Sequence, residues 1–277
     1  MTGFVNIFKA EGMNSTCVVN RLKRLYGVPC GHMGTLDPLA QGVLPVGVGN
    51  ATRLVDYFLD KRKAYTARFI FGATTDTLDR EGELVRGGRI PTAAEIEEVL
   101  PRFLGEIAQM PPIYSAKSVG GVKSYKLARK GQSVALTPKT VRIDAFELHA
   151  RTAEDEFEFT IVCGGGTYIR ALARDLSEML GTKGYMSFLR RDESGVFTKE
   201  TAVPLDSITP ENKESYLIPT DSVLPFPVFE SEDMRLLNGM SVPCTQADGL
   251  YKFYFNGSFY GLARVADGLV KAEKKLC

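Results

Sequence analysis

The chain has 277 residues, of which 44% are hydrophobic and 24% are charged, the composition of an ordinary globular protein and not of a disordered one. Its 34 basic and 33 acidic residues leave a net charge of +1, so the overall charge gives no support to nucleic-acid binding. No apolar run approaches the length of a membrane span, and the first residues lack the layout of a signal peptide, so we expect a cytoplasmic protein with one large domain or two smaller ones.

The N-terminal residues predict a strand followed by a helix. Residues 4–8 are a short apolar run typical of a strand. Asn14 or Ser15 can cap the helix that follows, and Gly27 before a proline is a typical helix end. The apolar residues of this helix fall on one face, namely Val18, Val19, Leu22 and Leu25.

Residues 31–45 place a single carboxylate, Asp37, in a run rich in glycine and proline, with His32 five positions before it. Small or apolar residues surround Asp37, so few local groups can solvate it, which makes it a candidate nucleophile or base. The other interpretation is structural. Asp-Pro also begins turns and caps helices, because the Asp side chain accepts hydrogen bonds from backbone N–H groups.

An apolar strand over residues 43–48 and a helix over 51–59 are expected next. Residues 65–71 then alternate between apolar and polar, which is the period of a strand with one buried face. Tyr65 therefore lies near the start of a strand. From the pattern alone, Tyr65 is one more inward-facing aromatic whose hydroxyl finds a neighbour.

Thr92 and Glu95 form a capping-box pattern that opens a helix over residues 92–103. The following stretch, residues 113–143, contains no acid and carries two tyrosines, Tyr114 and Tyr125, and a short predicted helix over 124–130. A stretch with only positive charges and interspersed tyrosines is suited to bind the phosphate backbone and bases of a nucleic acid. The other interpretation is a solvated basic loop. Its basic residues are Lys117, Lys123, Lys126, Arg129, Lys130, Lys139 and Arg142.

Residues 141–150 and 156–163 alternate as a pair of strands. Three glycines then precede Thr167, a plausible cap for a helix over residues 168–180. Arg170 falls in the first turn of this helix, where the helix dipole disfavours a cation. This placement suggests that an anion compensates Arg170, either a carboxylate distant in sequence or an ordinary ion-pair partner such as Asp175.

Residues 204–227 have the proline-rich, polar composition of a linker. After it, strand runs at 251–255, 259–265 and 269–272 are separated by the turn signals Asn256-Gly257 and Asp267-Gly268. A small β domain is expected here. Its acids and bases nearly balance, so RNA binding and a purely structural role are both open.

Cysteine and histidine usage argues against disulfides and metal. The five cysteines are scattered without a Cys-x-x-Cys pair, and the sequence has two histidines, His32 and His149. A His/Cys metal site would need distant residues with no spacing signal. We expect reduced thiols, no metal and no cofactor.

Several segments together match the segments of one known family. They occur in the family's order over most of residues 1–197, so the likeness does not depend on one motif. The matching segments are Gly31-His32-Met33-Gly34-Thr35-Leu36-Asp37-Pro38-Leu39-Ala40-Gln41-Gly42, Gly49-Asn50-Ala51-Thr52, Lys63-Ala64-Tyr65, Gly72-Ala73-Thr74-Thr75-Asp76-Thr77-Leu78-Asp79, Gln109-Met110-Pro111-Pro112-Ile113-Tyr114-Ser115-Ala116-Lys117, Gly166-Thr167-Tyr168-Ile169-Arg170 and Leu189-Arg190-Arg191. Together they resemble the TruB family of tRNA pseudouridine synthases.

The resemblance implies isomerisation of uridine to pseudouridine, most specifically at uridine 55 in the TΨC loop of tRNA. It assigns Asp37 as the nucleophile, attacking the sugar C1′ or the base C6 or assisting a glycal route. Tyr65 would stack on the flipped base and could accept a proton late in the reaction. Arg170 would hold Asp37 by ion pairing.

The resemblance also assigns residues that bind substrate. Tyr168 and Leu189 would line the pocket, and His32 would enter the opened RNA loop, although a capping or core role for its imidazole is the other interpretation. Lys9 lies in the family's Lys-Pro-x-Gly-x-Thr-Ser segment. Here Ala10 replaces the proline and Asn14 the threonine, which leaves the stiffness of this loop and the role of Lys9 open.

The implied fold is a mixed α/β (α+β) pseudouridine synthase fold, with a largely antiparallel central sheet flanked by helices. We expect a catalytic domain at residues 1–215, in which residues 113–143 are an inserted segment that grips RNA, and a PUA-like β domain at 222–277. The expected partner is the T stem-loop of tRNA. The sequence carries no oligomer signal, so a monomer is expected.

Two other functions compete with this one. An RNA chaperone that folds tRNA would need the basic stretch but not the catalytic residues. A small-molecule glycosidase or nucleosidase using Asp37 would need a second carboxylate. The nearest candidates, Asp76 and Asp79, both have the pattern of turn residues.

The basic stretch gives the first prediction. Reversing the charges of Lys123 and Lys126 should weaken tRNA binding and reduce the slope of log Kd against log salt by roughly 1 to 2, because two phosphate contacts are lost. A salt titration of binding to an unmodified tRNA transcript measures this. An unchanged affinity across the titration would remove the stretch from the RNA interface.

Overall fold

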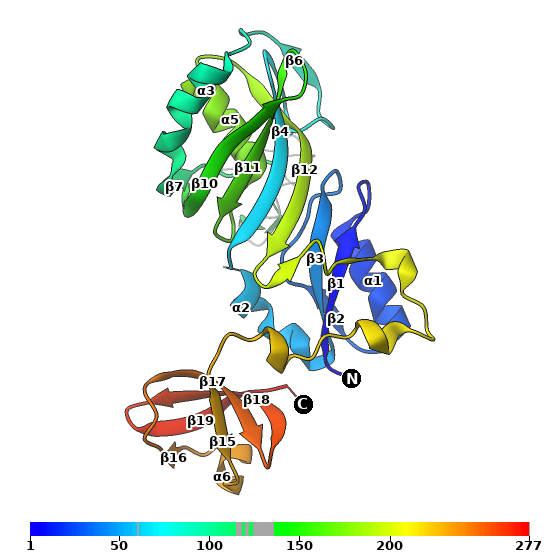
Figure 1. Ribbon diagram of the computed structural model, residues 1–277, viewed down its shortest axis with the longest axis vertical. Helices are drawn as coiled ribbons and strands as arrows, with labels where there is room; N and C mark the ends of the chain where they lie inside the picture. The colour runs from blue at the N-terminus through cyan, green and yellow to red at the C-terminus, as the bar shows by residue number, and fades with distance from the viewer. Residues whose placement is uncertain (60, 115–117, 120–121, 124–135, 277) are drawn as a thin grey trace.

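The computed structural model describes residues 1–59, 61–114, 118–119, 122–123 and 136–276. The helix predicted over 124–130 and the side chains of Lys123 and Lys126 lie outside what is described. The described elements form two bodies, a large one built on a long sheet and a small C-terminal one (Figure 1). No helix in the described ranges has both the length and the apolar character needed to cross a membrane.

The large sheet has ten strands in the described part of the chain. Its main path runs β14-β1-β3-β12-β4-β11-β10-β7, and β2 and β13 pair beside it. Neighbours are antiparallel except for β1 with β14 and β3 with β12. The strands are β1 (Gly3–Lys9), β2 (Cys30–His32), β3 (Gln41–Val48), β4 (Lys63–Phe71), β7 (Gly105–Gln109), β10 (Lys139–Arg151), β11 (Glu156–Cys163), β12 (Gly184–Ser194), β13 (Phe197–Thr198) and β14 (Val203–Pro204).

Helices cover one face of this sheet, and in Figure 1 the other face of β4, β10, β11 and β12 is turned to the viewer. α3 and α5 pack on the hidden face over a core rich in phenylalanine. The helices of the large body are α1 (Ser15–Tyr26), the 3-10 turn η1 (Gly49–Leu54), α2 (Val55–Leu59), α3 (Ala93–Val99), η2 (Leu100–Phe103), α5 (Ile169–Met179), η3 (Leu205–Ser207) and η4 (Lys213–Tyr216).

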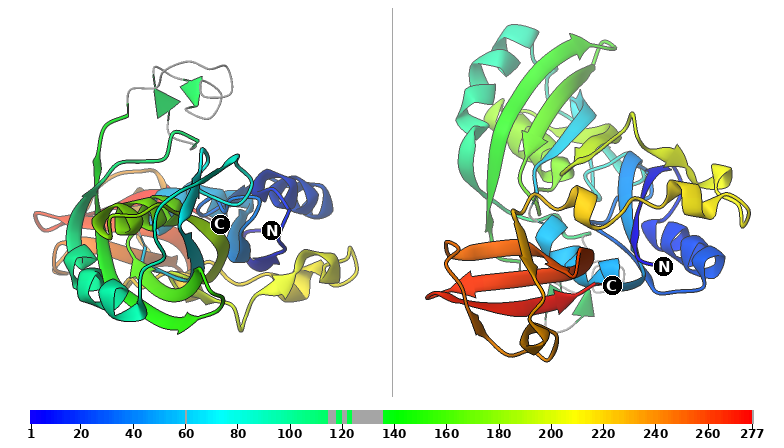
Figure 2. Two further views of the ribbon diagram at one scale, coloured as in Figure 1. Left: turned by 90° about the horizontal axis from the view of Figure 1, so that it is seen from above. Right: turned by 60° about the horizontal axis from the view of Figure 1, so that its bottom comes forward.

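Two short ribbons complete the large body. β5 (Ala73–Thr75) pairs with β6 (Leu84–Arg86), and β8 (Ser118–Val119) pairs with β9 (Val122–Lys123). The left view of Figure 2 shows the ribbon of β8 and β9 standing away from the large sheet. The segment expected to grip RNA therefore includes a ribbon that projects from the body.

Local cap chemistry correctly predicted where two helices begin. Asn14 accepts a hydrogen bond from the Thr16 N–H at the start of α1, which ends at Gly27 with φ of +70°. Thr92 and Glu95 form the predicted capping box of α3. The helix predicted over 51–59 is present only in part, because its first half is the 3-10 turn η1.

Strand prediction succeeded where alternation was clean and failed at β12. β4 buries Tyr65 and Phe69 on one face and leaves its alternate residues partly exposed, as predicted. β12 lies at the centre of the sheet, but its pairing with β4 shifts register twice, at Met186/Phe188 and at Arg191/Glu193. These irregularities interrupt the alternation of buried and exposed residues, so the sequence pattern does not predict the strand.

The C-terminal body is a curled five-stranded sheet ordered β15-β17-β18-β19-β16. Its two predicted turns are present, with positive φ at Asn256, Gly257, Asp267 and Gly268. The bounds of its elements are η5 (Asp221–Val223), β15 (Val228–Ser231), α6 (Met234–Leu237), β16 (Val242–Pro243), β17 (Gly249–Phe255), β18 (Ser258–Ala266) and β19 (Leu269–Lys275).

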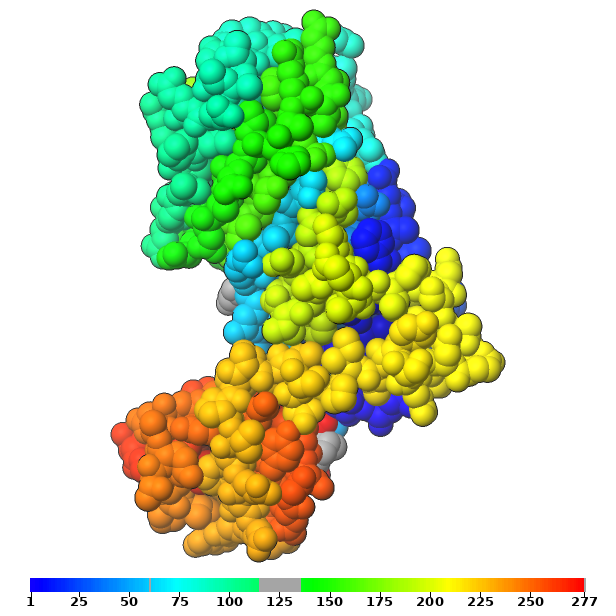
Figure 3. Space-filling model, in the orientation of Figure 1, coloured from blue at the N-terminus to red at the C-terminus, as the bar shows by residue number. Residues whose placement is uncertain are grey.

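The two bodies share a hydrophobic core. Leu262 and Leu276 of the C-terminal body belong to one buried cluster with Phe4 and Phe58 of the large body. Tyr57 on α2 also donates a hydrogen bond to Glu273, at 2.6 Å. In Figure 3 the yellow-to-orange linker packs between the two bodies. The small sheet is therefore fixed against α2.

The close approach of β3 and β12 requires glycine at position 42. Gly42 has φ of +109°, and a Cβ there would come within 2.2 Å of the Arg191 carbonyl oxygen. We predict that Gly42→Ala destabilises the protein by more than about 3 kcal/mol, because both backbone strain and a backbone clash must be relieved. Thermal unfolding measures this.

Gly12→Ala is the matched control. Gly12 has φ of +78°, but its Cβ would meet nothing within 4 Å, so only the left-handed strain of about 1 kcal/mol remains. If the two variants lost equal stability, the result would contradict the proposed clash of residue 42 with β12.

Candidate active site

A cavity of about 300 Å³ lies where the loop between β2 and β3 meets the start of α5. The loop brings Asp37, β4 brings Tyr65, and α5 with its preceding residue brings Arg170 and Tyr168. β12 contributes Leu189 and Arg191. Segments distant in the sequence thus place acidic, basic and aromatic side chains around one hollow, as an active site requires.

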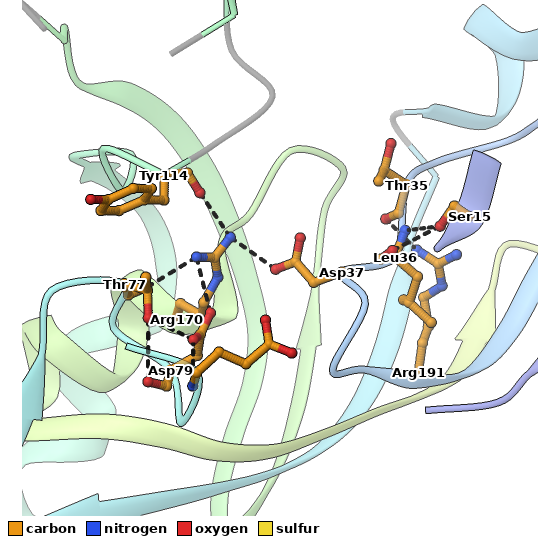
Figure 4. Close-up of polar contacts among 10 residues, drawn as sticks. Ser15, Thr35, Leu36, Asp37, Thr77, Asp79, Tyr114, Arg170 and Arg191 are labelled. Atoms are coloured by element: carbon orange, nitrogen blue, oxygen red, sulfur yellow. Dashed lines mark hydrogen bonds and ion pairs between the residues drawn. The ribbon is translucent and has the colours of Figure 1, made fainter. Parts of the chain in front are cut away.

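Arg170 joins two carboxylates at this cavity (Figure 4). Its Nη2 lies 2.9 Å from Oδ2 of Asp37, and its Nη1 lies 3.2 Å from Oδ2 of Asp79. The side chains of Arg170 and Asp79 are 8% and 6% exposed, whereas that of Asp37 is 36% exposed. The expected pairing of Arg170 with Asp37 is present, and Asp175 pairs with Arg174 instead.

Backbone carbonyls complete the environment of Arg170. Nη1 also donates to the Thr77 oxygen and Nη2 to the Tyr114 oxygen, each at 3.0 Å. The guanidinium is therefore held from both sides, which fixes the oxygen of Asp37 that it contacts.

Asp79 is a turn residue, as predicted, but it also has a second role. Its Oδ1 does accept turn hydrogen bonds, from the Thr77 hydroxyl and the Glu81 N–H. Its Oδ2, however, is the buried partner of Arg170. The partner could not be inferred from the turn pattern, because the ion pair depends on the approach of α5. Asp76 is exposed and accepts only from the Glu83 N–H among the described bonds.

Side chains from two other elements hold the backbone on either side of Asp37. The Ser15 hydroxyl, at the start of α1, donates to the Leu36 oxygen and accepts from the Leu36 N–H. On the other side, Lys9 Nζ donates to the Pro38 oxygen at 3.2 Å. The flanking peptides of Asp37 are thus bonded to α1 and β1.

Lys9 is fully buried and also donates to the oxygens of Ala10 and Met13. It therefore ties its own loop to the Asp37 loop, even though alanine stands where the family has proline. Burial lowers the pKa of Lys9 to about 8, with the charge of Asp37 acting in the opposite direction. Lys9 does not line the cavity.

The start of α5 is fixed by Gln109 and not by Thr167, so the predicted cap was wrong. The Gln109 amide accepts from the Tyr168 N–H at 2.9 Å and donates to the Tyr168 oxygen at 3.1 Å. The Thr167 hydroxyl instead donates to the Gly164 oxygen. Gln109 comes from β7, so sequence neighbours of the helix gave no signal of it.

Tyr65 and His32 occupy different environments. Tyr65 is buried in the wall of the cavity, and burial raises the pKa of its phenol to about 12. His32 does not line the cavity and is half-buried. Its Nδ1 is buried without a hydrogen-bond partner among the described residues, and burial lowers the pKa of the imidazole.

Family models match most of the chain. The model described as TruB family pseudouridylate synthase (N terminal domain) matches residues 23–169, and that described as tRNA pseudouridylate synthase B C-terminal domain matches residues 170–225.

Relatives that match nearly the whole chain are named tRNA pseudouridine synthase B. The protein from Caldanaerobacter subterraneus subsp. tengcongensis is 40% identical, covering 99% of this chain and 98% of the relative. That from Clostridium perfringens is 36% identical and covers 100% of this chain and 99% of the relative. A chain in the crystal structure of a Cbf5-Nop10-Gar1 complex has the same fold, with a TM-score of 0.73, 24% identity, and coverage of 99% of this chain and 85% of that one.

The pKa of Tyr65 gives a prediction for the pH dependence of the reaction. Because a phenol with a pKa of about 12 stays protonated at lower pH, its ionisation should add no basic limb to the rate between about pH 7 and about pH 10. Single-turnover rates of wild type and Tyr65→Phe should therefore run parallel across this range, with the variant slower. A limb that vanishes in Tyr65→Phe would contradict the assignment.

Proposed function

The chain belongs to the TruB family of pseudouridylate synthases, and we propose that it acts on uridine 55 in the TΨC loop of tRNA with Asp37 as the nucleophile. It is a tRNA pseudouridine synthase, an isomerase. The observation that carries the choice of Asp37 is its ion pair with Arg170 at the mouth of a cavity that also holds Tyr65.

The reaction breaks the C1′–N1 bond of uridine, turns the uracil and forms a C1′–C5 bond. The proton at C5 is lost and one is gained at N1, so atoms balance without any other reactant. The target base must leave its stack, which costs about a few kcal/mol that the pocket has to return. A cavity of about 300 Å³ offers a place for one pyrimidine ring.

Asp37 is suited to attack because its position is fixed while its carboxylate remains accessible. One oxygen pairs with Arg170, and the side chain keeps 36% of its surface exposed. Fixing a nucleophile before substrate arrives avoids much of the entropy cost of bringing the reacting atoms together. Ser15 and Lys9 contribute to this from outside the cavity.

The proposal assigns the remaining residues as follows. Tyr65 stacks on the flipped base, and Tyr168 and Leu189 close the pocket around it. His32, on the strand that leads into the Asp37 loop, enters the opened RNA loop. Lys9 supports the Asp37 loop and touches no substrate.

Residues 113–143 grip the RNA, and the described part includes the projecting ribbon of β8 and β9. We divide the chain into a catalytic domain at residues 1–215 and a PUA-like domain at 222–277, acting as a monomer in the cytoplasm on the T stem-loop. No group of metal-binding side chains is found among the described residues, and the isomerisation itself asks for no external reactant.

The geometry disfavours a small-molecule glycosidase. Such an enzyme needs a second carboxylate free to act on the substrate, and the carboxylate of Asp79 is 6% exposed and bonded to Arg170. An RNA chaperone remains the alternative that does not depend on catalysis, and it is compatible with the same RNA-binding surface.

The decisive experiment measures pseudouridine in an unmodified tRNA transcript, mapped to the nucleotide. Wild type should modify uridine 55, and Asp37→Ala should form no detectable product while still binding the transcript, because the nucleophile alone is lost. Asp76→Asn is the matched control. It removes an exposed carboxylate of a nearby turn and should leave the rate unchanged.

If Asp37→Ala formed product at the wild-type rate, Asp37 would be excluded as the nucleophile. Modification at another position would exclude the specificity for uridine 55. A wild type that binds tRNA but forms no product would support the chaperone function instead.

A further inference from the structure

Arg191 is a fully buried side chain of the cavity wall to which the proposed reaction has assigned no role. It lies on β12, where its backbone pairs with Gly42 of β3 on one side and with Tyr65 of β4 on the other. Its side chain is 1% exposed and lines the cavity. Arg191 therefore stands between the strand that follows the Asp37 loop and the strand that carries Tyr65.

The guanidinium of Arg191 bonds both ends of the Asp37 loop. Nη2 donates to the Gly34 oxygen at 3.1 Å and Nη1 to the Thr35 oxygen at 3.4 Å, both before Asp37. Nε donates to the Val43 oxygen at 2.7 Å, after it. In Figure 4, Arg191 lies on the side of the loop away from Arg170. One rigid planar group thus sets the separation of the loop's two ends.

The charge of Arg191 has no acidic partner. Among the described residues no carboxylate lies within ion-pair distance of it, whereas Arg170 has two. An unpaired buried cation is costly, and backbone carbonyls alone could be bonded by a neutral donor. The positive charge therefore has a use in the cavity, where the only lining carboxylate among the described residues is that of Asp37.

We propose that Arg191 is a positioning residue for pseudouridine formation, which fixes the backbone of the Asp37 loop and holds an unneutralised positive charge against the reacting base. It acts through Asp37 and through the field in the cavity, so it serves the chemical step and not the binding of tRNA. The proposal rests on the nucleophilic role proposed for Asp37.

The charge of Arg191 also acts on neighbouring titratable groups. Burial raises the pKa of the Tyr65 phenol, and the charge of Arg191 opposes that rise. The same charge adds to the effect of burial in lowering the pKa of Lys9 and of His32. The field of Arg191 thus reaches groups on β1, β2 and β4.

The test compares Arg191→Lys and Arg191→Met with Arg190→Met. Arg190 is the adjacent residue on β12. Its side chain is 31% exposed and pairs with Asp192. Arg190→Met therefore controls for the removal of any arginine from this strand. Single-turnover formation of pseudouridine at saturating enzyme gives the rate, filter binding gives the Kd for the transcript, and thermal unfolding gives the Tm.

We expect Arg191→Lys to slow the reaction about 10-fold and Arg191→Met about 100-fold or more, since small misplacements of a reacting group have such effects. The Kd should stay within about 3-fold of wild type for both. Arg190→Met should keep the wild-type rate. Lysine keeps the positive charge but lacks the planar guanidinium, so a rate between those of wild type and Arg191→Met separates the two contributions. If the role of Arg191 were purely structural, variants of equal Tm would not differ in rate.

An Arg191→Lys rate equal to wild type would overturn the proposal, because lysine cannot bond three carbonyls of the loop in one plane. So would a loss confined to Kd, or an Arg190→Met rate as low as that of Arg191→Met. Should Arg191→Met fail to fold, Arg191→Lys decides alone. Wild type and Asp37→Ala run beside these variants, so an inactive wild type or an active Asp37→Ala would fault the proposed function and not the role of Arg191.

Discussion

The bonding of one short stretch of backbone, the Asp37 loop, to its neighbours is the constraint on which the rest of the site depends. The loop is rich in glycine and proline and has no regular structure of its own. Its peptides are bonded instead by side chains from α1, β1 and β12, through Ser15, Lys9 and Arg191. The sheet order places these elements next to the loop, so the fold supplies the rigidity that the loop's sequence lacks.

The electrostatics of the cavity follow from the same arrangement. Arg170 is neutralised by Asp37 and Asp79 together, and Asp79 is the more deeply buried of the two acids. A substrate that displaced Arg170 from Asp37 would still leave it paired. In the proposed mechanism, Asp79 would keep the guanidinium in place while Asp37 changes its bonding. The charge of Arg191, on the far side of the loop, has no acidic partner in the described part of the chain.

Sequence reasoning succeeded where the signal was local. Caps such as Asn14 and Thr92, the alternation of β4 and the two C-terminal turns depend on neighbours a few residues apart. It failed at β12, whose bulges break the period, and at contacts that close only in the folded chain. Gln109 replaces Thr167 at the start of α5, and the ion pair of Asp79 with Arg170 gave no local signal because Arg170 is on another element. The function itself came from resemblance across many segments and not from composition or periodicity.

The core shared by the two bodies bears on how they unfold. Phe4 of the first strand and Leu276 belong to the same buried cluster, and the termini lie close together in Figures 1 and 2. Partial unfolding of the C-terminal body would therefore remove buried contacts from this cluster, so the stability of the large body is coupled to that of the small one.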